Sequence, residues 1–125
     1  MSFEEAEVLR ERAEAFLRNA RNLLREGEHD LAAFSIEQYC QLILKYKLLI
    51  KTGTYPHTHS IIRLIKELAK VTNGAEKLLS NITMITKIED AYIGSRYLPR
   101  RYEKREVEDM LKYVEEEFKP VIDEL

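Results

Sequence analysis

Arginine and tyrosine gather in one short stretch of this chain, between Tyr92 and Tyr102. The stretch reads Tyr-Ile-Gly-Ser-Arg-Tyr-Leu-Pro-Arg-Arg-Tyr and contains Arg96, Arg100 and Arg101. A guanidinium group binds a carboxylate or a phosphate through a planar pair of N–H donors, and a tyrosine ring offers a face on which a base stacks. This stretch is therefore the part of the sequence best suited to an anionic, partly aromatic ligand such as a nucleotide.

Two histidines and one more tyrosine extend the candidate anion-binding set. Tyr97 offers a ring for stacking on a base, although a tyrosine beside a proline more often packs over the end of a bundle. His57 and His59 are two positions apart in an expected turn, a spacing that suits contact with one phosphate or one metal ion. Metal sites use three or four protein ligands and no third is evident, so we predict no metal and give His59 a hydrogen-bonding role at a helix start. Tyr92 is expected in the core.

The formal net charge of -2 conceals two basic segments. No acidic residue occurs between Glu37 and Glu67, an interval that contains Lys51 and four other cationic residues. A second cationic cluster, from Arg96 to Arg105, is relieved only by Glu103. Either the two segments converge on one anion, with no acid around the arginines, or the cations simply form the solvated faces of helices.

Apolar residues recur at helical spacing in five segments, which predict an all-α fold: an up-and-down antiparallel bundle of about five helices in a single domain over residues 1–125. Cys40, the single cysteine, excludes an internal disulfide and reads as a small buried side chain. The expected helices run from Ser2, with Glu5 in a capping box, to Gly27; from Asp30 to Gly53; from Ile61 to Asn73; from Leu78 to about Tyr97, ahead of Pro99; and from Val107 to Phe118, where Pro120 kinks or stops the helix.

The second expected helix is apolar almost all round. Such a helix is buried on more than one side, so we expect it at the centre of the bundle and also at the seam of a homodimer. Ser35, Gln38 and Gln41 put polar groups on this helix, and three places for them stay open: a pocket, a dimer seam or a solvent-facing strip.

No apolar segment approaches the roughly 20 residues that cross a bilayer, and acidic residues stand where a signal peptide would be basic. We therefore expect a cytoplasmic protein without membrane contact. Nothing in the sequence calls for a cofactor.

Four short motifs, in this order and spacing, resemble the HEPN family of small helical domains. They cover nearly the whole chain: the stretch from Asp30 to Gln41, the run Leu48-Leu49-Ile50-Lys51, the helix start Thr58-His59-Ser60-Ile61, and the segment Tyr92-Ile93-Gly94-Ser95-Arg96-Tyr97-Leu98-Pro99, which is similar to the family's Arg-Tyr-Pro segment with one residue inserted.

The resemblance implies a helical bundle that dimerises, commonly works beside a small nucleotidyltransferase partner, and in many members is the toxin half of a toxin–antitoxin pair. Some members are ribonucleases, with an arginine followed after four to six residues by a histidine. No histidine follows His59 here, and the pair Arg25 and His29 has the wrong gap at the wrong end of the chain. The tyrosine-bearing version that a partner modifies is absent too. We therefore assign no catalytic residue.

Three functions remain open. The favoured one is a non-catalytic component that binds a nucleotide or another anion and acts with a nucleotidyltransferase partner. The second is a divergent, metal-independent ribonuclease that uses Arg96 with His57 or His59 from another part of the dimer. The third is a dimer that binds RNA or is purely structural.

Overall fold

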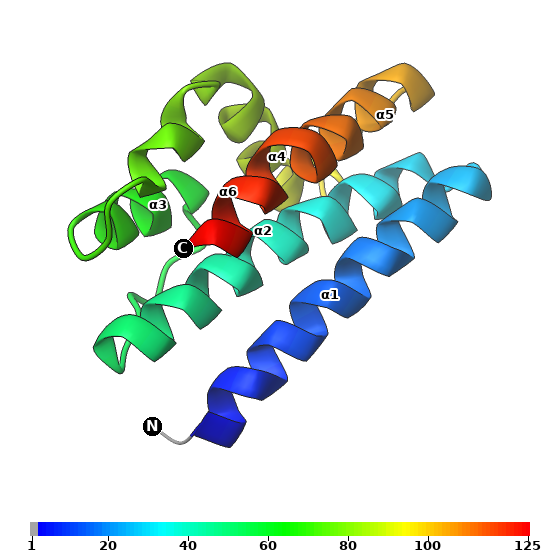
Figure 1. The fold of residues 1–125 in the computed structure, drawn as a ribbon. Coiled ribbons are helices and arrows are strands. Elements are labelled where there is room, and N and C mark those ends of the chain that lie inside the picture. Colours follow the sequence, from blue (N-terminus) through cyan, green and yellow to red (C-terminus); the bar gives the residue numbers. More distant parts are fainter. Residues whose placement is uncertain (1–2) are drawn as a thin grey trace.

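The computed structural model describes residues 3–125, in which helices pack around a central helix, α2 (Figure 1). No strand occurs within this described range, which confirms the predicted all-α helical bundle. The α-helices are α1 (Phe3–Arg25), α2 (His29–Thr52), α3 (Ile61–Ala69), α4 (Ile82–Gly94), α5 (Lys104–Tyr113) and α6 (Lys119–Glu124); a 3₁₀ helix spans Ala75–Leu79 and a π-helical turn spans Val114–Phe118.

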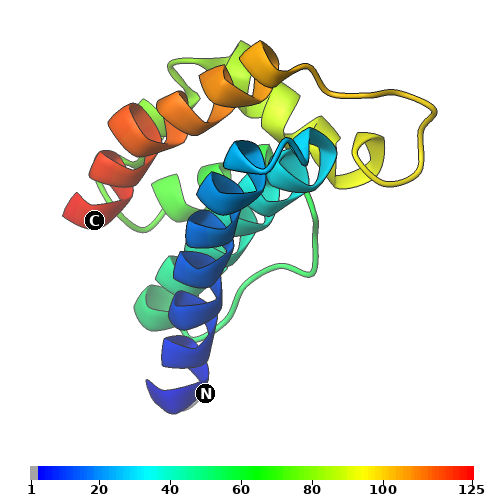
Figure 2. The same ribbon diagram turned by 90° about the vertical axis from the view of Figure 1, so that its right-hand side faces the viewer.

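Helices α1 and α2 form an antiparallel pair, joined by a tight turn at Gly27 with φ 81° (Figures 1 and 2). Helix α2 also contacts α3, α4 and α5, so most of its apolar residues are buried within one chain, although Leu31 and Ile50 are exposed. The dimer prediction thereby loses much of the argument on which it was based and stays a prediction. The predicted capping box of α1 depends on Ser2, which lies outside the described residues.

Helix α2 ends at Gly53, which adopts the left-handed conformation at φ 85° and donates its N–H to the Leu49 carbonyl at 2.9 Å. The following linker, residues 54–60, runs back beside the bundle towards α4 (Figure 2). It ends at Ser60, whose Oγ accepts the Arg63 N–H at 3.2 Å and caps α3. The linker thus carries His59 to the C-terminal half of α4.

The fourth expected helix is interrupted, which corrects its predicted start. Leu78 and Leu79 belong to the separate 3₁₀ helix, and α4 begins only at Ile82. The break lies at Asn81, whose Oδ1 accepts the Met84 N–H at 3.2 Å. Leu78 is nevertheless buried, so its spacing correctly indicated the core while the asparagine cap set the helix boundary.

Pro120 does not stop the last helix, contrary to one of the two predicted outcomes. The backbone widens into the π-helical turn just before the proline, and α6 continues to Glu124. Pro120 therefore stands in the first turn of α6, where a missing N–H costs no helical hydrogen bond. Phe118 and Ile122 stay buried on either side of it.

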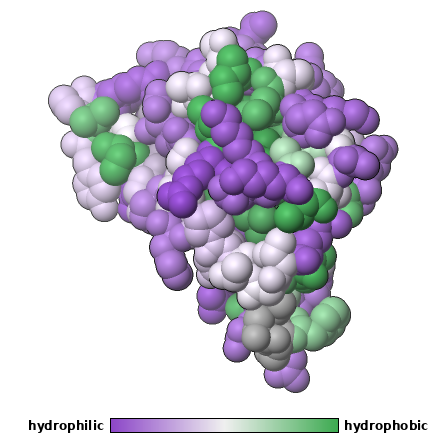
Figure 3. Space-filling view, turned by 90° about the vertical axis from the view of Figure 1, so that its left-hand side faces the viewer, coloured by the Kyte–Doolittle hydropathy of each residue, from purple (hydrophilic) through white to green (hydrophobic). Residues whose placement is uncertain are grey.

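The face on the side of α3 and the C-terminal end of α2 is mixed in character (Figure 3). Hydrophilic side chains cover most of it, and they separate its apolar patches. Within the described residues, no helix combines the length and the apolarity needed to cross a bilayer.

The connection from α4 to α5 folds back over the end of α4 and is fixed at two points. The Tyr102 N–H donates to Asp30 Oδ1 at 2.7 Å, which ties the connection to the first turn of α2. The Tyr102 ring is buried against Gly94, where a Cβ atom would lie 3.0 Å from the tyrosine Oη. Glycine at this position therefore allows the close approach that positions the arginine-rich segment.

We predict that Gly94→Ala destabilises the protein by about 1 kcal/mol, because the new methyl group meets a hydroxyl on a buried ring that has little room to shift. Urea unfolding monitored by circular dichroism measures the change. The double variant Gly94→Ala/Tyr102→Phe removes that hydroxyl and should recover most of the loss relative to Tyr102→Phe alone. A stabilising Gly94→Ala, as expected for an unobstructed helical site, contradicts this account.

Candidate functional site

Arg96 is held in an aromatic cage at the C-terminal end of α4. Its Cζ atom lies 4.4 Å from the ring centroid of Phe34, 4.5 Å from that of Tyr92 and 4.7 Å from that of Tyr97. Its Nε and Nη2 donate to the Tyr92 carbonyl at 2.9 and 2.6 Å, and Nη1 donates to Tyr97 Oη at 3.3 Å. One edge of the guanidinium thus caps the helix, while N–H groups on both Nη atoms remain without an acceptor among residues 3–125.

Tyr92 links this cage to His59, and the prediction that it belongs to the core is wrong. The tyrosine is half-buried, and its ring stacks on the His59 imidazole with centroids 4.1 Å apart and planes 21° apart. Tyr92 Oη and His59 Nε2 lie 3.1 Å apart, within hydrogen-bonding distance. One tyrosine ring therefore contacts both Arg96 and His59 within a single chain.

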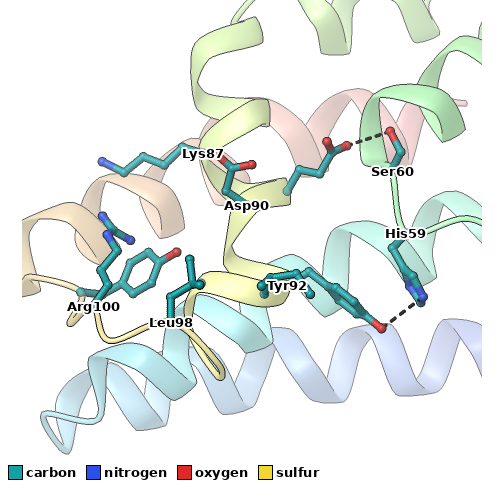
Figure 4. Close-up of a pocket in the computed structure, with 11 residues that line it drawn as sticks. His59, Ser60, Lys87, Asp90, Tyr92, Leu98 and Arg100 are labelled. Carbon is teal, nitrogen blue, oxygen red and sulfur yellow. Dashed lines mark hydrogen bonds between the residues drawn. The ribbon is translucent and has the colours of Figure 1, made fainter.

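The position of His59 depends on Glu89 of α4. One carboxylate oxygen of Glu89 accepts a hydrogen bond from Ser60 Oγ at 2.9 Å and another from the Ile62 N–H at 3.1 Å. These bonds fasten the N-terminus of α3, and with it the residue before Ser60, to the side of α4 (Figure 4). Glu89 thus has a structural role at the wall of the site.

A cavity of about 650 Å³ opens between the start of α3, the side of α4 and the connection to α5 (Figure 4). Its size falls within the usual range for small-molecule sites. His59 and Ser60 lie at one end, and Lys87 and Arg100 lie at the other. The wall also contains Asp90, Tyr92, Leu98 and Tyr102. Cationic, acidic and aromatic groups therefore face one space.

The cations at the far end of this cavity are already paired, contrary to the expectation that no acid accompanies the arginines. Glu106 of α5 binds Lys87 at 3.0 Å and Arg100 at 2.5 Å. Partial burial acts to raise the pKa of Glu106, but hydrogen bonds from these two cations leave it below its usual value. Arg100 also lies over the Tyr102 ring, with its Cζ atom 3.9 Å from the centroid. Its charge is thus largely committed within the fold.

Glu37 is the residue of this site that the sequence analysis missed. It is fully buried on α2, where its carboxylate accepts Gln38 Nε2 at 2.8 Å and Gln41 Nε2 at 2.5 Å. Burial raises its pKa from an ordinary 4.5 to about 7, against the opposing effects of the two glutamines and of the charges on Arg96 and Lys45. Gln38 and Gln41, for which the sequence left a pocket, a dimer seam and a solvent-facing strip open, therefore hold a buried carboxylate.

A signal for Glu37 was present in the sequence. The glutamate lies three positions after Phe34, on the same side of a helix that is apolar almost all round. A carboxylate in such a helix is buried and needs partners, and the glutamines at positions 38 and 41 are those partners. The contact of the cage with Phe34 had no comparable signal, because it joins positions 62 residues apart.

Lys51 lies far from the cage, so the structure does not bring the two basic segments together through it. Its Nζ donates to the Leu125 carbonyl at 2.9 Å, at the C-terminal end of α2. At 1.5 Å per residue, this end is about 25 Å along the helix from Phe34. Lys45 comes closer, since its Nζ donates to Gln41 Oε1 at 3.3 Å.

His57, Arg101 and Tyr97 differ in how closely they join the site. His57 lies beside Tyr55, with centroids 6.1 Å apart, on a groove that Val8 also lines and away from the cage. Arg101 is exposed and has no acidic partner among residues 3–125. Tyr97 is 68% exposed, so most of its ring is open to a ligand although it contacts Arg96.

Within the described range, no three histidine, cysteine, aspartate or glutamate side chains are arranged to hold a metal ion. Cys40 is buried against the core, and burial raises the pKa of its thiol well above the ordinary value. The residues with chemistry to offer are therefore Arg96, His59 and Glu37, with the tyrosines around them.

Comparison with known proteins gives one match. The family model described as the HEPN domain matches residues 6–124, a range that contains every residue of the site. No curated protein and no solved structure shows a significant match to the chain.

The raised pKa of Glu37 predicts how stability depends on pH. Between about pH 4.5 and pH 7 the folded chain binds more protons at Glu37 than the unfolded chain does, so the contribution of this residue to stability falls by about 3 kcal/mol as pH rises through that window. Glu37→Gln should remove this loss. The free energy of unfolding of the variant, relative to that of the parent protein, should therefore rise between pH 4.5 and pH 8.

Urea unfolding at several pH values measures this difference. Glu108→Gln is the matched control, because Glu108 is an exposed glutamate on α5. The same pH slope in the parent protein and in Glu37→Gln would mean that Glu37 is ionised at no cost.

Proposed function

Because the chain belongs to the HEPN domain family, we propose that it binds a phosphate-bearing ligand, a nucleotide or RNA, and acts without catalysis as a toxin–antitoxin-type component beside a small nucleotidyltransferase partner. The observation that carries the binding part is the cage around Arg96, which fixes a guanidinium with free N–H groups at the surface.

The cage lowers the entropic cost of binding an anion. An arginine side chain ordinarily loses much rotamer freedom when it grips a ligand. Here three rings and the Tyr92 carbonyl already hold Arg96 in place. A phosphate would meet a pre-oriented pair of N–H donors, and the exposed ring of Tyr97 offers a face to a base.

The same end of the bundle supports the proposal of a protein partner. Ile93 is 46% exposed, Leu98 is 54% exposed, and both lie beside the arginines. Exposed apolar, tyrosine and arginine side chains together are the composition typical of protein interfaces. A nucleotidyltransferase, itself a nucleotide-binding protein, would cover this surface and share the ligand. A homodimer and a cytoplasmic location belong to the same proposal.

The binding proposal predicts that Arg96→Gln weakens affinity for a short oligoribonucleotide by about tenfold to a hundredfold, the usual cost of losing a charge-assisted hydrogen bond. Arg105→Gln is the matched control, since Arg105 is an exposed arginine paired with Asp109 on α5. Arg101→Gln should have a smaller effect and reduce the salt dependence of binding. Titration calorimetry over a salt series measures all three, and equal affinity of Arg96→Gln and Arg105→Gln would reject the cage as the binding site.

A second function has one specific observation in its favour. Tyr92 contacts both His59 and Arg96, so an imidazole that could act as general acid or base and a cation lie against one ring within one chain. Metal-independent RNA cleavage needs these two groups: the base removes the proton of the ribose 2′-hydroxyl as that oxygen attacks phosphorus, and the cation stabilises the added negative charge.

The ribonuclease alternative predicts cleavage of end-labelled RNA in the presence of a chelator, with products ending in a 2′,3′-cyclic phosphate. His59→Ala and Arg96→Ala should each reduce the rate at least a hundredfold, in the range of lost general acid–base catalysis. His57→Ala is the control, because His57 faces a different groove. RNA that stays intact with the parent protein assigns the chain to the binding function.

A further inference from the structure

Glu37 and Arg96 carry opposite charges near the cage but differ in their access to solvent. The Glu37 carboxylate has no access to water, whereas Arg96 is exposed. The bond partners of the carboxylate are two neutral amides, Gln38 and Gln41. Arg96 acts on it through its charge alone, and its guanidinium covers the ring of Phe34, which lies about one helical turn before Glu37 on α2. The buried ion is therefore compensated by a cation that a ligand can reach.

An anion bound to Arg96 would change the field at Glu37. The positive charge of Arg96 favours the ionised carboxylate, because it offsets part of the cost of burial. A phosphate on the guanidinium cancels much of that charge and adds a negative one nearby. Glu37 then loses one of the two cations that support its ionisation and keeps only Lys45, whose own pKa is lowered by partial burial.

We propose, on the basis of the anion site proposed above, that phosphate binding at Arg96 is coupled to protonation of Glu37, so that the protein takes up a proton from solvent when it binds the ligand. The carboxylate and a solvent proton form the neutral acid, and no other bond is made or broken. Linkage then makes the site tighter below neutral pH and weaker above it.

The charged and titratable groups around Glu37 define what else could take part. Arg96 reaches it from the end of α4, and Lys45 and the thiol of Cys40 lie on α2 itself. The imidazole of His59 also lies near the cage, one ring away from Arg96. Glu37 and His59 are therefore the two residues that the test must separate.

The balance between the ionised and the neutral form of Glu37 allows a coupling near physiological pH. Its pKa of about 7 means that the free protein carries a mixture of the ionised and the neutral form. A rise of one pKa unit on binding would give an uptake of about half a proton per ligand at pH 7.5, and a several-fold loss of affinity from about pH 6 to pH 8.5. A carboxylate with an ordinary pKa would show no such effect in this range.

The experiment is isothermal titration calorimetry with a short oligouridylate whose ends are free hydroxyls, because its phosphodiesters do not titrate in this range. Measurements at pH 7.5 in buffers of different ionisation enthalpy report the number of protons taken up by the parent protein. The same titrations with Glu37→Gln and His59→Gln identify the residue that takes them. Sulfate, which also does not titrate, serves as a second probe, and circular dichroism checks that the variants are folded.

The expected result is proton uptake by the parent protein and by His59→Gln and none by Glu37→Gln, which should also bind several-fold more tightly than the parent at pH 8.5. Binding without proton uptake by the parent overturns the coupling and leaves the anion site in place. Uptake that persists in Glu37→Gln and disappears in His59→Gln assigns the proton to the histidine and likewise overturns it. If neither probe binds the parent protein at any pH, the proposed anion site itself is wrong.

Discussion

The burial of most of α2 is the constraint on which the rest of the structure depends. A helix that is apolar around nearly its whole circumference has no stable place at a surface, so the other helices must pack around it. Helices α1, α3, α4 and α5 all contact it, which leaves the connections between them on the outside of the bundle. Arg96 and His59 lie on two of these connections, whereas Glu37 lies on α2 itself.

The same burial makes the ionisation of Glu37 costly. Glu37 lies on the buried side of α2, so its carboxylate is in the interior, where ionisation is costly unless hydrogen bonds and charges support it. Two glutamines and the charges of Arg96 and Lys45 supply that support only in part, since the pKa stays raised. A site whose compensation is incomplete is one whose charge state can respond to a ligand.

In Arg96, the atoms that stabilise the fold differ from those that stay open at the surface. Nε and Nη2 both donate to the Tyr92 carbonyl in the last turn of α4, a favourable place for a cation because it faces the negative end of the helix dipole. The ring contacts fix its plane, and the remaining N–H groups point to no acceptor within residues 3–125. A structural reading of the arginine and a functional one are therefore compatible, which the spacing of the sequence could not show.

The sequence by itself determined the fold class and the family, because helical periodicity, turn residues and short motifs are local properties. It did not determine the boundary at Asn81, where a side-chain cap competes with apolar spacing, or the continuation past Pro120, where a π-helical turn relieves the proline. Only the tertiary structure decided that Tyr92 contacts both His59 and Arg96 and that Glu106 pairs with Arg100. It also decided that Lys51 lies at the opposite end of α2 and that the buried carboxylate of Glu37 is within reach of the charge on Arg96. Each of these contacts depends on which segments are adjacent in space, and local sequence patterns do not specify contacts between segments that are far apart in the chain.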